Sequence, residues 1–229
     1  MTLARWPAAL LVVAVLACSQ GGAGSPDPAA LLRQSASAMG SVRSLKADLT
    51  FGPGVVYQGF TLASAQAVVA APSSSDTTLK VRQQDFLVDL RVVAVDGAVY
   101  VKAPFTAWEQ IPAQEAAQLP DLAALFDART GLPALLAQGR AARYLGTEKA
   151  GGVDCDKVSA TYTADQVASL LHGFKPAGDI EATLWMGRAD HRLYRLLLSG
   201  PLVAAGQKTT VDIAISGYDA PVTIARPTP

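Results

Sequence analysis

The stretch FLVDLRVVAVDGAVYV, residues 86–101, decides the fold of this chain. Apolar side chains stand at every second position of its first half, and the charged Asp89 and Arg91 fall between them. Alternation with a period of two predicts a strand with one buried and one solvated face. Asp96-Gly97 then supplies the residue pair that a two-residue hairpin turn prefers, and apolar residues continue beyond it. The stretch therefore predicts an antiparallel hairpin.

The same period of two recurs on both sides of this hairpin. It predicts further strands over residues 45–51, 60–71, 79–82, 141–148, 153–162, 180–187, 192–199 and 209–217. Helical spacing instead marks residues 29–40, which follow Pro26-Asp27-Pro28, and residues 163–171, where Thr163 and Gln166 have the spacing of a capping box.

The middle of the chain differs from both flanks. Residues 113–139 carry many leucines and few charges at helical spacing, interrupted by Pro120, Gly131 and Pro133. Ten or so strands with a few helices predict an α+β fold, a single antiparallel sheet in one domain. A sheet of that size with one apolar face is expected to curl, and the helices are expected to cover its concave side.

The first 17 residues have the form of an export signal. An uncharged apolar run from Trp6 to Ala17 follows Arg5, and it is too short to span a bilayer, which takes about 20 residues. Val15-Leu16-Ala17-Cys18 resembles the bacterial lipobox, in which the cysteine thiol receives a diacylglyceryl group and the chain is cut before it. We therefore predict a signal peptide over residues 1–17, acylation of Cys18 with chains such as palmitate, and a flexible tether over residues 18–26. The alternative is an ordinary secretory signal in which Cys18 is incidental.

Length and composition bound the remainder of the chain. Residues 27–225 suffice for one domain with a full core, and residues 226–229 read as a tail. Lys and Arg number 19, as do Asp and Glu, and loss of Arg5 with the signal leaves 18 against 19. This balance gives no indication of the concentrated basic surface that a nucleic-acid partner needs, so no such partner is predicted. Half of the residues are hydrophobic and 17% are charged, which indicates a large core or an apolar surface for a ligand or membrane.

Enzymatic chemistry has no recognisable residues to perform it. His172 and His191 are the only histidines, and neither has the cysteine spacing of a zinc site. The sequence contains no Gly-x-Ser-x-Gly elbow and no glycine-rich phosphate loop after a strand. With Cys18 acylated, Cys155 has no disulfide partner, and we expect it to be a small buried hydrophobe. We therefore predict no enzymatic activity, no metal and no cofactor.

Several short stretches of the sequence also resemble those of a known protein family. They are the lipobox, Val42–Ala47, Val93–Tyr100 with Trp108, Asp127–Leu136, Ala182–Met186 and Ile215–Tyr218. Their order and spacing resemble the mycobacterial LppX/LprA/LprF/LprG lipoproteins over nearly all of residues 27–225. Cys155 is a departure, since the family tends to have glycine in a turn there.

The resemblance implies a fold and a function. The fold would be a half-open antiparallel barrel, similar to LolA-type periplasmic lipoprotein carriers, with helices over an apolar cavity. The function would be to bind multi-acylated lipids or glycolipids and carry them across or within an actinobacterial cell envelope. The anchor would sit on the outer face of the plasma membrane, with a membrane lipid exporter as a candidate partner. Which lipid is bound does not follow from the resemblance.

The apolar alternation supplies a wall and a cover for such a cavity. Each CH₂ removed from water contributes about 0.8 kcal/mol, so the acyl chains need a deep apolar site. The predicted lining is Leu49, Phe60, Leu62, Leu79, Val81, Phe86, Val88, Leu90, Val92, Leu122, Leu125, Phe126, Leu132 and Leu135. Alternation identifies the face but does not distinguish a hollow face from a filled core, so both interpretations stay open.

Leu79 and Val81 are the preferred wall positions by the family match. Arg129, Lys149 and Lys175, in predicted loops, are candidates to meet an anionic headgroup, the alternative being ordinary solvated charge. Two other functions remain open as well: a lipid-responsive sensor or adaptor that regulates a membrane partner, and a structural envelope protein that binds no lipid.

Overall fold

The computed structural model describes residues 25–57, 59–71, 73–84, 86–116, 125, 127, 129–170, 175–204 and 206–228. Its strands are β1 (Ser44–Phe51), β2 (Val56–Tyr57), β3 (Phe60–Ala70), β4 (Ser74–Gln83), β5 (Phe86–Val95), β6 (Ala98–Lys102), β7 (Glu109–Gln110), β8 (Arg140–Ala150), β9 (Val153–Tyr162), β10 (Ile180–Gly187), β11 (Leu193–Ala204) and β12 (Gln207–Ser216). Its helices are α1 (Pro28–Met39), α2 (Ala113–Ala116), α3 (Leu132–Leu136) and α4 (Ala164–Leu170).

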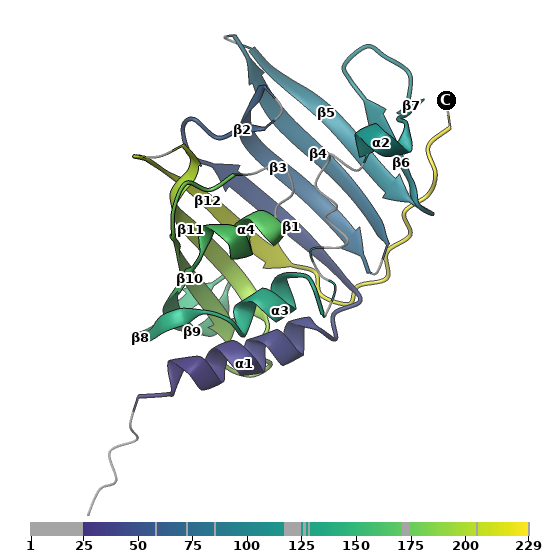
Figure 1. Cartoon of the computed structure of the whole chain (residues 1–229). Coiled ribbons are helices and arrows are strands. Elements are labelled where there is room, and N and C mark those ends of the chain that lie inside the picture. Colours follow the sequence, from purple (N-terminus) through teal and green to yellow (C-terminus); the bar gives the residue numbers. More distant parts are fainter. Residues whose placement is uncertain are drawn as a thin grey trace, which may run out of the picture.

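The twelve strands of the described residues form one antiparallel sheet. Eleven of them follow the order β7-β6-β5-β4-β3-β1-β12-β11-β10-β9-β8, and β2 pairs with β3 beside this path. The strand β1 lies in the middle, between β3 and β12, and a meander of consecutive strands extends on each side of it. The predicted single curved antiparallel sheet is confirmed (Figure 1).

The pairing register carries one apolar face across the whole sheet. Leu49 of β1 stands opposite Ala65 of β3 and Ile213 of β12. From Ala65 the same row continues to Leu79 of β4 and Leu90 of β5. Side chains at paired positions point to the same side of a sheet, so these residues share one face. The helices α1, α3 and α4 lie on this side, which is the concave one (Figure 1).

The largest core lies between these helices and the strands β1 and β9–β12. Helix α1 begins where the Asp27 carboxylate accepts a hydrogen bond from the Ala29 N–H at 3.0 Å, with Pro28 in its first turn. Its inward face buries Leu32 and Met39 almost completely. Leu184 of β10 lies in the same cluster and is inaccessible to solvent. This half of the concave face is therefore an ordinary packed core.

Local signals read from the sequence are borne out at two turns. Asp96 and Gly97 both have positive φ, 52° and 73°, as a type I′ hairpin turn requires. Thr163 and Gln166 exchange hydrogen bonds, with the Gln166 N–H donating to Thr163 Oγ1 at 3.2 Å and the Thr163 N–H donating to Gln166 Oε1 at 2.8 Å. The capping box that opens α4 is therefore confirmed.

One expectation was met in part and another was wrong. Of the helical pattern predicted over residues 113–139, the described residues include α2 and α3, and residues 129–131 form a turn at the expected interruption, whereas Pro133 lies in the first turn of α3. A Cβ at Gly131 would stand 2.4 Å from the Leu125 carbonyl oxygen, so the chain folds back on this glycine instead of continuing a helix. Lys149 was expected in a loop, but it lies in β8, where it forms an ion pair with Asp154 at 2.7 Å across the hairpin.

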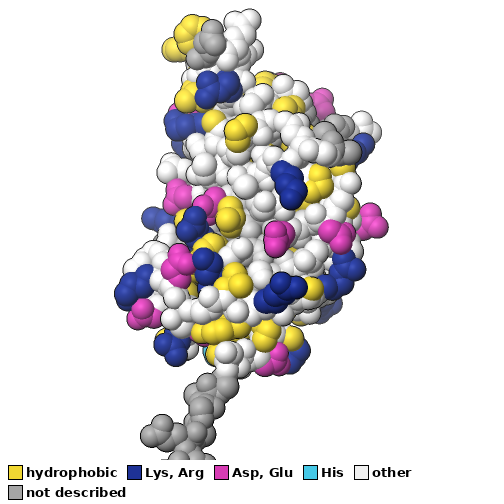
Figure 2. All heavy atoms as spheres, turned by 90° about the vertical axis from the view of Figure 1, so that its left-hand side faces the viewer, with side chains coloured by type: hydrophobic (Ala, Val, Ile, Leu, Met, Phe, Trp, Pro, Cys, Tyr) yellow, Lys and Arg dark blue, Asp and Glu magenta, His cyan; other side chains and the backbone are white. Residues whose placement is uncertain are grey.

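The convex side of the sheet carries smaller apolar clusters. Cys155 is free and fully buried beside Trp185, and burial raises the pKa of its thiol, so the expected small buried hydrophobe is confirmed. Near the other edge, Val93 and Tyr100 pack against Ile224 of the C-terminal segment. Basic and acidic side chains are interspersed over the side of the molecule seen in Figure 2. None of the helices in the described ranges combines the length and the apolarity needed to cross a bilayer.

Candidate functional site

A second apolar cluster occupies the concave face of the other meander. Leu62 of β3 and Val81 of β4 are buried there together with Val55, which precedes β2. Leu79, Val88 and Leu90 pack against these three residues and are only half-buried. This half of the concave face is therefore apolar, but several of its side chains are only partly buried.

The predicted wall residues come together in this cluster. Leu62 stands opposite Val81, which stands opposite Val88, and Leu79 stands opposite Leu90 in the next row. The side chain of Val92, one row further, is also half-buried. The wall predicted from alternation is therefore one contiguous surface over β3, β4 and β5.

Three other predicted wall residues lie around this surface. Leu49 on β1 packs against the large core, so it connects the two halves of the concave face. Phe60 and Phe86 stand at the ends of β3 and β5, with exposed fractions of 43% and 72%. These two form a rim, not a wall.

The predicted cover residues lie mainly on the helical half. Leu132 and Leu135 of α3 line a cavity of about 30 Å³, together with Leu136, Tyr162, Val167, Leu170, Leu184, Leu196 and Leu198. That volume suits a water molecule or two, whereas sites for drug-sized ligands measure roughly 300–1,000 Å³. Leu125 is half-buried, and Leu122 and Phe126 lie outside the described residues. The helical half, as described, has little room for an acyl chain.

Polar side chains interrupt the apolar face in β4. Ser75 and Thr77 point to the same side as Leu79 and Val81 and are 4% and 3% exposed. The hydroxyl of Thr77 is buried and finds no hydrogen-bond partner among the described residues. These two positions were not predicted, because a period of two is visible only where apolar and polar residues alternate.

The candidate headgroup cations come from three different elements. Arg129 is exposed in a turn before α3, where the Asp127 carboxylate accepts hydrogen bonds from the backbone N–H groups of Arg129 and Thr130, both at 2.9 Å. Together with the Thr130 hydroxyl, these donors lower the pKa of Asp127. Lys149 is paired as described above, and Lys175 is exposed after α4. Their assignment to a headgroup stays a prediction, and Cys18 and His172 lie outside the described residues.

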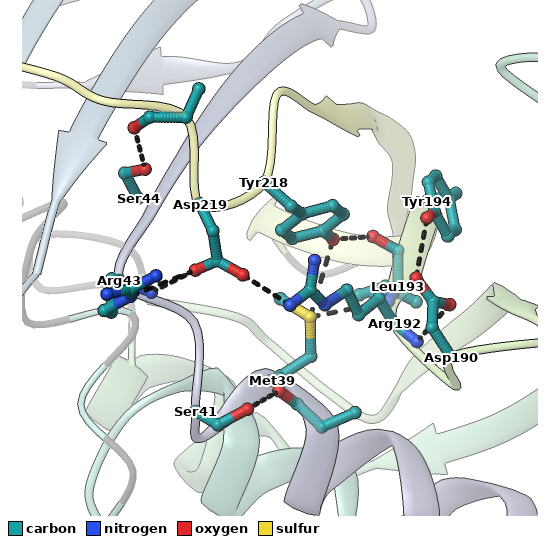
Figure 3. A network of polar contacts seen from close by, with 12 residues as sticks. Met39, Ser41, Arg43, Ser44, Asp190, Arg192, Leu193, Tyr194, Tyr218 and Asp219 are labelled. Carbon is teal, nitrogen blue, oxygen red and sulfur yellow. Dashed lines mark hydrogen bonds and ion pairs between the residues drawn. The ribbon is translucent and has the colours of Figure 1, made fainter.

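A polar network that was not predicted from the sequence lies around Asp219, near the start of β1 (Figure 3). The Asp219 carboxylate accepts a hydrogen bond from the Arg43 N–H at 2.9 Å and pairs with the guanidinium of Arg192. These partners lower the pKa of Asp219. The Tyr218 hydroxyl donates to the Leu193 carbonyl, and burial raises its pKa. The network thus joins the start of β1, the turn between β10 and β11, and the C-terminal segment.

The pairing of these groups with one another supports a structural role for the network. Its groups are ion-paired or hydrogen-bonded to one another, as Asp190 is to the Tyr194 hydroxyl at 2.8 Å, a contact that with burial raises the pKa of Tyr194 to about 12. His191 lies in the same turn with a φ of 58°. Within the described ranges, no group of three or more His, Cys, Asp or Glu side chains is placed to hold a metal ion.

The chain is similar to known proteins over most of its length. The model of the LppX_LprAFG lipoprotein family matches residues 27–224. The lipoarabinomannan carrier protein LprG of Mycolicibacterium smegmatis is 28% identical over 204 residues, which are 86% of this chain and 83% of that protein. LprG of Mycobacterium leprae is 23% identical over 187 residues, 81% of this chain and 68% of that protein.

Solved structures show the same fold. LprF from Mycobacterium bovis superposes with a TM-score of 0.73 at 22% identity, covering 90% of this chain and all of that one. LppX from Mycobacterium tuberculosis superposes with a TM-score of 0.63 at 23% identity, covering 87% of this chain and all of that one. The family model thus matches the chain from Asp27, the residue before α1, to the C-terminal segment, and the fold is a curved antiparallel sheet with helices on its concave side. The chain is therefore a member of the LppX_LprAFG lipoprotein family.

Proposed function

We propose that this protein is an exported lipoprotein that binds multi-acylated lipids or glycolipids on the concave face of β3–β5 and carries them across or within the cell envelope. The observation that carries the proposal is the half-buried apolar surface made by Leu79, Val88 and Leu90. Apolar side chains on a concave face gain free energy by leaving water, at about 25 cal/mol per Å². Acyl chains laid along this surface would supply that burial.

The two halves of the concave face favour this location for the lipid. The cavity described in the helical half measures about 30 Å³, so a lipid placed there would have to displace α3 or α4. On β3–β5 the apolar rows run from the rim residues Phe60 and Phe86 toward the buried Leu62 and Val81. A lipid can enter along these rows without a rearrangement of the packed core.

The relatives support acylated glycolipids as the ligand class. The matched LprG proteins are named lipoarabinomannan carriers, and they cover most of this chain. The lipobox at Cys18 supports attachment to the outer face of the plasma membrane, because two or more acyl chains make anchoring stable where one does not. A membrane lipid exporter remains the candidate partner for the step that delivers or removes the lipid.

Native mass spectrometry tests the proposal most directly. Residues 19–229 would be expressed without the anchor in an actinobacterial host and purified without detergent. We expect a stoichiometric adduct that releases lipids with two or three acyl chains on solvent extraction. A bare polypeptide mass, from protein that also takes up no added glycolipid, would show that the apolar face is filled, and the proposal would be wrong.

A pair of substitutions locates the site. Leu79→Trp places an indole on the half-buried wall, and we expect it to reduce the adduct without unfolding the protein. Leu145→Trp adds the same bulk at an exposed position of β8, and we expect it to leave the adduct unchanged. Transfer of lipid between two vesicle populations then separates a carrier from a sensor, which would bind lipid without exchanging it.

A further inference from the structure

Exposed apolar side chains gather at one end of the sheet. Six large hydrophobic side chains are exposed in the described residues, and four of them are Val56, Phe60, Phe86 and Leu87, at 40%, 43%, 72% and 55%. The pairing of β2 with β3, and of β3 and β5 with β4, places these four where β2 meets β3 and where β4 meets β5. We call this set the apolar tip.

The apolar tip is continuous with the proposed lipid surface. Phe86 stands opposite Gln83 of β4, and the next inward row on that side of the sheet is Val81 opposite Val88 and Leu62. Phe86 therefore lies on the concave face, in line with Val88 and Leu90, two and four residues along β5. An acyl chain leaving the cluster around Val81 would reach the tip without crossing a polar row other than Gln83.

Basic side chains flank the tip. Arg82 is exposed on β4, on the side of the sheet opposite Val81 and in the same row as Leu87. Lys208 is exposed on β12, next to Thr209, whose hydroxyl donates to the Pro53 carbonyl in the loop before Val56. Neither cation takes part in an ion pair within the described residues. Asp85, in the same hairpin, lies outside them.

The tip and the start of the domain lie at opposite ends of the molecule. Helix α1 is at one end in Figure 1, and the β4–β5 hairpin is at the other. Hydrophobic and basic side chains stand together at the corresponding end in Figure 2. The seven residues 18–24 span at most about 25 Å when fully extended, so a chain anchored at Cys18 holds the α1 end near its membrane.

We propose that the apolar tip is the surface through which the protein touches a lipid bilayer, with Phe86 and Leu87 inserted at the interface and Arg82 and Lys208 facing anionic headgroups. The proposal rests on the proposed lipid-carrying function. Aromatic and aliphatic side chains beside basic ones suit an anionic bilayer surface, where burial and charge attraction add.

Vesicle flotation with the unacylated mature chain tests this inference, because binding then reports the domain and not the anchor. We expect binding to vesicles of phosphatidylcholine with phosphatidylglycerol, and weaker binding to phosphatidylcholine alone. Replacing two tip residues that point away from the lipid wall, Val56→Ser with Leu87→Ser, should weaken binding at least about tenfold. Arg82→Gln should cause a smaller loss, about fivefold, that disappears at high salt.

The matched control is Leu145→Ser, which removes an equally exposed leucine from β8 and should leave vesicle binding unchanged. Far-UV circular dichroism and the lipid adduct in native mass spectra show that each variant is folded and loaded. Loss of vesicle binding with the adduct retained supports the tip. Vesicle binding that is absent in the original chain, equal in the double variant, or reduced as much by Leu145→Ser overturns it, whereas absence of any adduct would overturn the lipid-carrying function instead.

Discussion

The two halves of the concave face are built from one sheet and one alternation, yet they bury their side chains differently. On β9–β12 most inward residues are buried, and Leu184 and Leu193 are inaccessible, because α1, α3 and α4 pack on them. On β4 and β5 the equivalent residues Leu79 and Leu90 are half-buried. A period of two therefore decides which face is apolar, and the placement of the helices decides whether that face is fully buried or stays partly exposed.

The largest expected effect separates the two halves by their contribution to stability. Leu184→Ala removes a fully buried side chain from a packed core and should lower the free energy of unfolding by about 2–5 kcal/mol. Leu90→Ala removes the same atoms from a half-buried position and should cost about 1 kcal/mol. Urea unfolding of lipid-free protein, with the slope compared between variants, measures both. Equal losses would mean that the β4–β5 half is packed as tightly as the other, and the comparison above would fail.

A medium effect on stability is expected at the polar network around Asp219 (Figure 3). Asp219→Asn keeps the shape of the side chain but removes the charge that Arg43 and Arg192 contact, and should cost about 1–3 kcal/mol at neutral pH. Because the pKa of Asp219 is lowered in the folded protein, its contribution is complete above the ordinary aspartate pKa, about 4, and is lost as the pH falls through the lowered value.

The stability difference between the original chain and Asp219→Asn should therefore shrink below about pH 4, measured by urea unfolding at a series of pH values. The control Asp96→Asn lies in a hairpin turn that accepts asparagine equally well, and should change stability by less than about 0.5 kcal/mol. A difference that stays constant down to pH 2 would show that the Asp219 charge does not stabilise the fold.

The smallest expected effect has the opposite sign. Thr77→Val replaces a buried hydroxyl that has no partner among the described residues, and should stabilise the lipid-free protein by about 1 kcal/mol. The neighbouring Thr78→Val, on the other side of β4, serves as the matched control and should have little effect. Thermal unfolding followed by circular dichroism reads both. A destabilised Thr77→Val would reveal that this hydroxyl does make a hydrogen bond.

Much of the fold could be predicted from local patterns. The strands over residues 153–162 and 180–187 have the predicted bounds, because apolar and polar residues alternate cleanly there. The strand β4 begins at Ser74, five residues before the predicted start, because Ser75 and Thr77 replace apolar residues on its inward face. Alternation depends on contrast between two faces, so it fails where both are polar.

The sequence predicted which residues make up the wall of the site better than it predicted how exposed that wall is. Leu62, Leu79, Val81, Val88 and Leu90 were expected on one wall, and the register brings them together. The exposure of that wall depends on where helices from a distant part of the chain lie. The alternation of apolar and polar residues carries no information about the position of those helices. The network around Asp219 was missed for the same reason, since its contact with Arg43 joins residues 176 positions apart.

The central position of β1 has a consequence for how the protein is made. Each flank of the sheet is a meander of neighbouring strands, so it can form soon after its own residues are available. The β1–β12 pair instead closes a loop of about 160 residues, and pairings of such separation form late. A chain that emerges N-terminus first keeps one edge of β1 unpaired until residues 207–216 follow. We therefore expect truncation before residue 207 to leave two local meanders with an open seam between them, which limited proteolysis would detect.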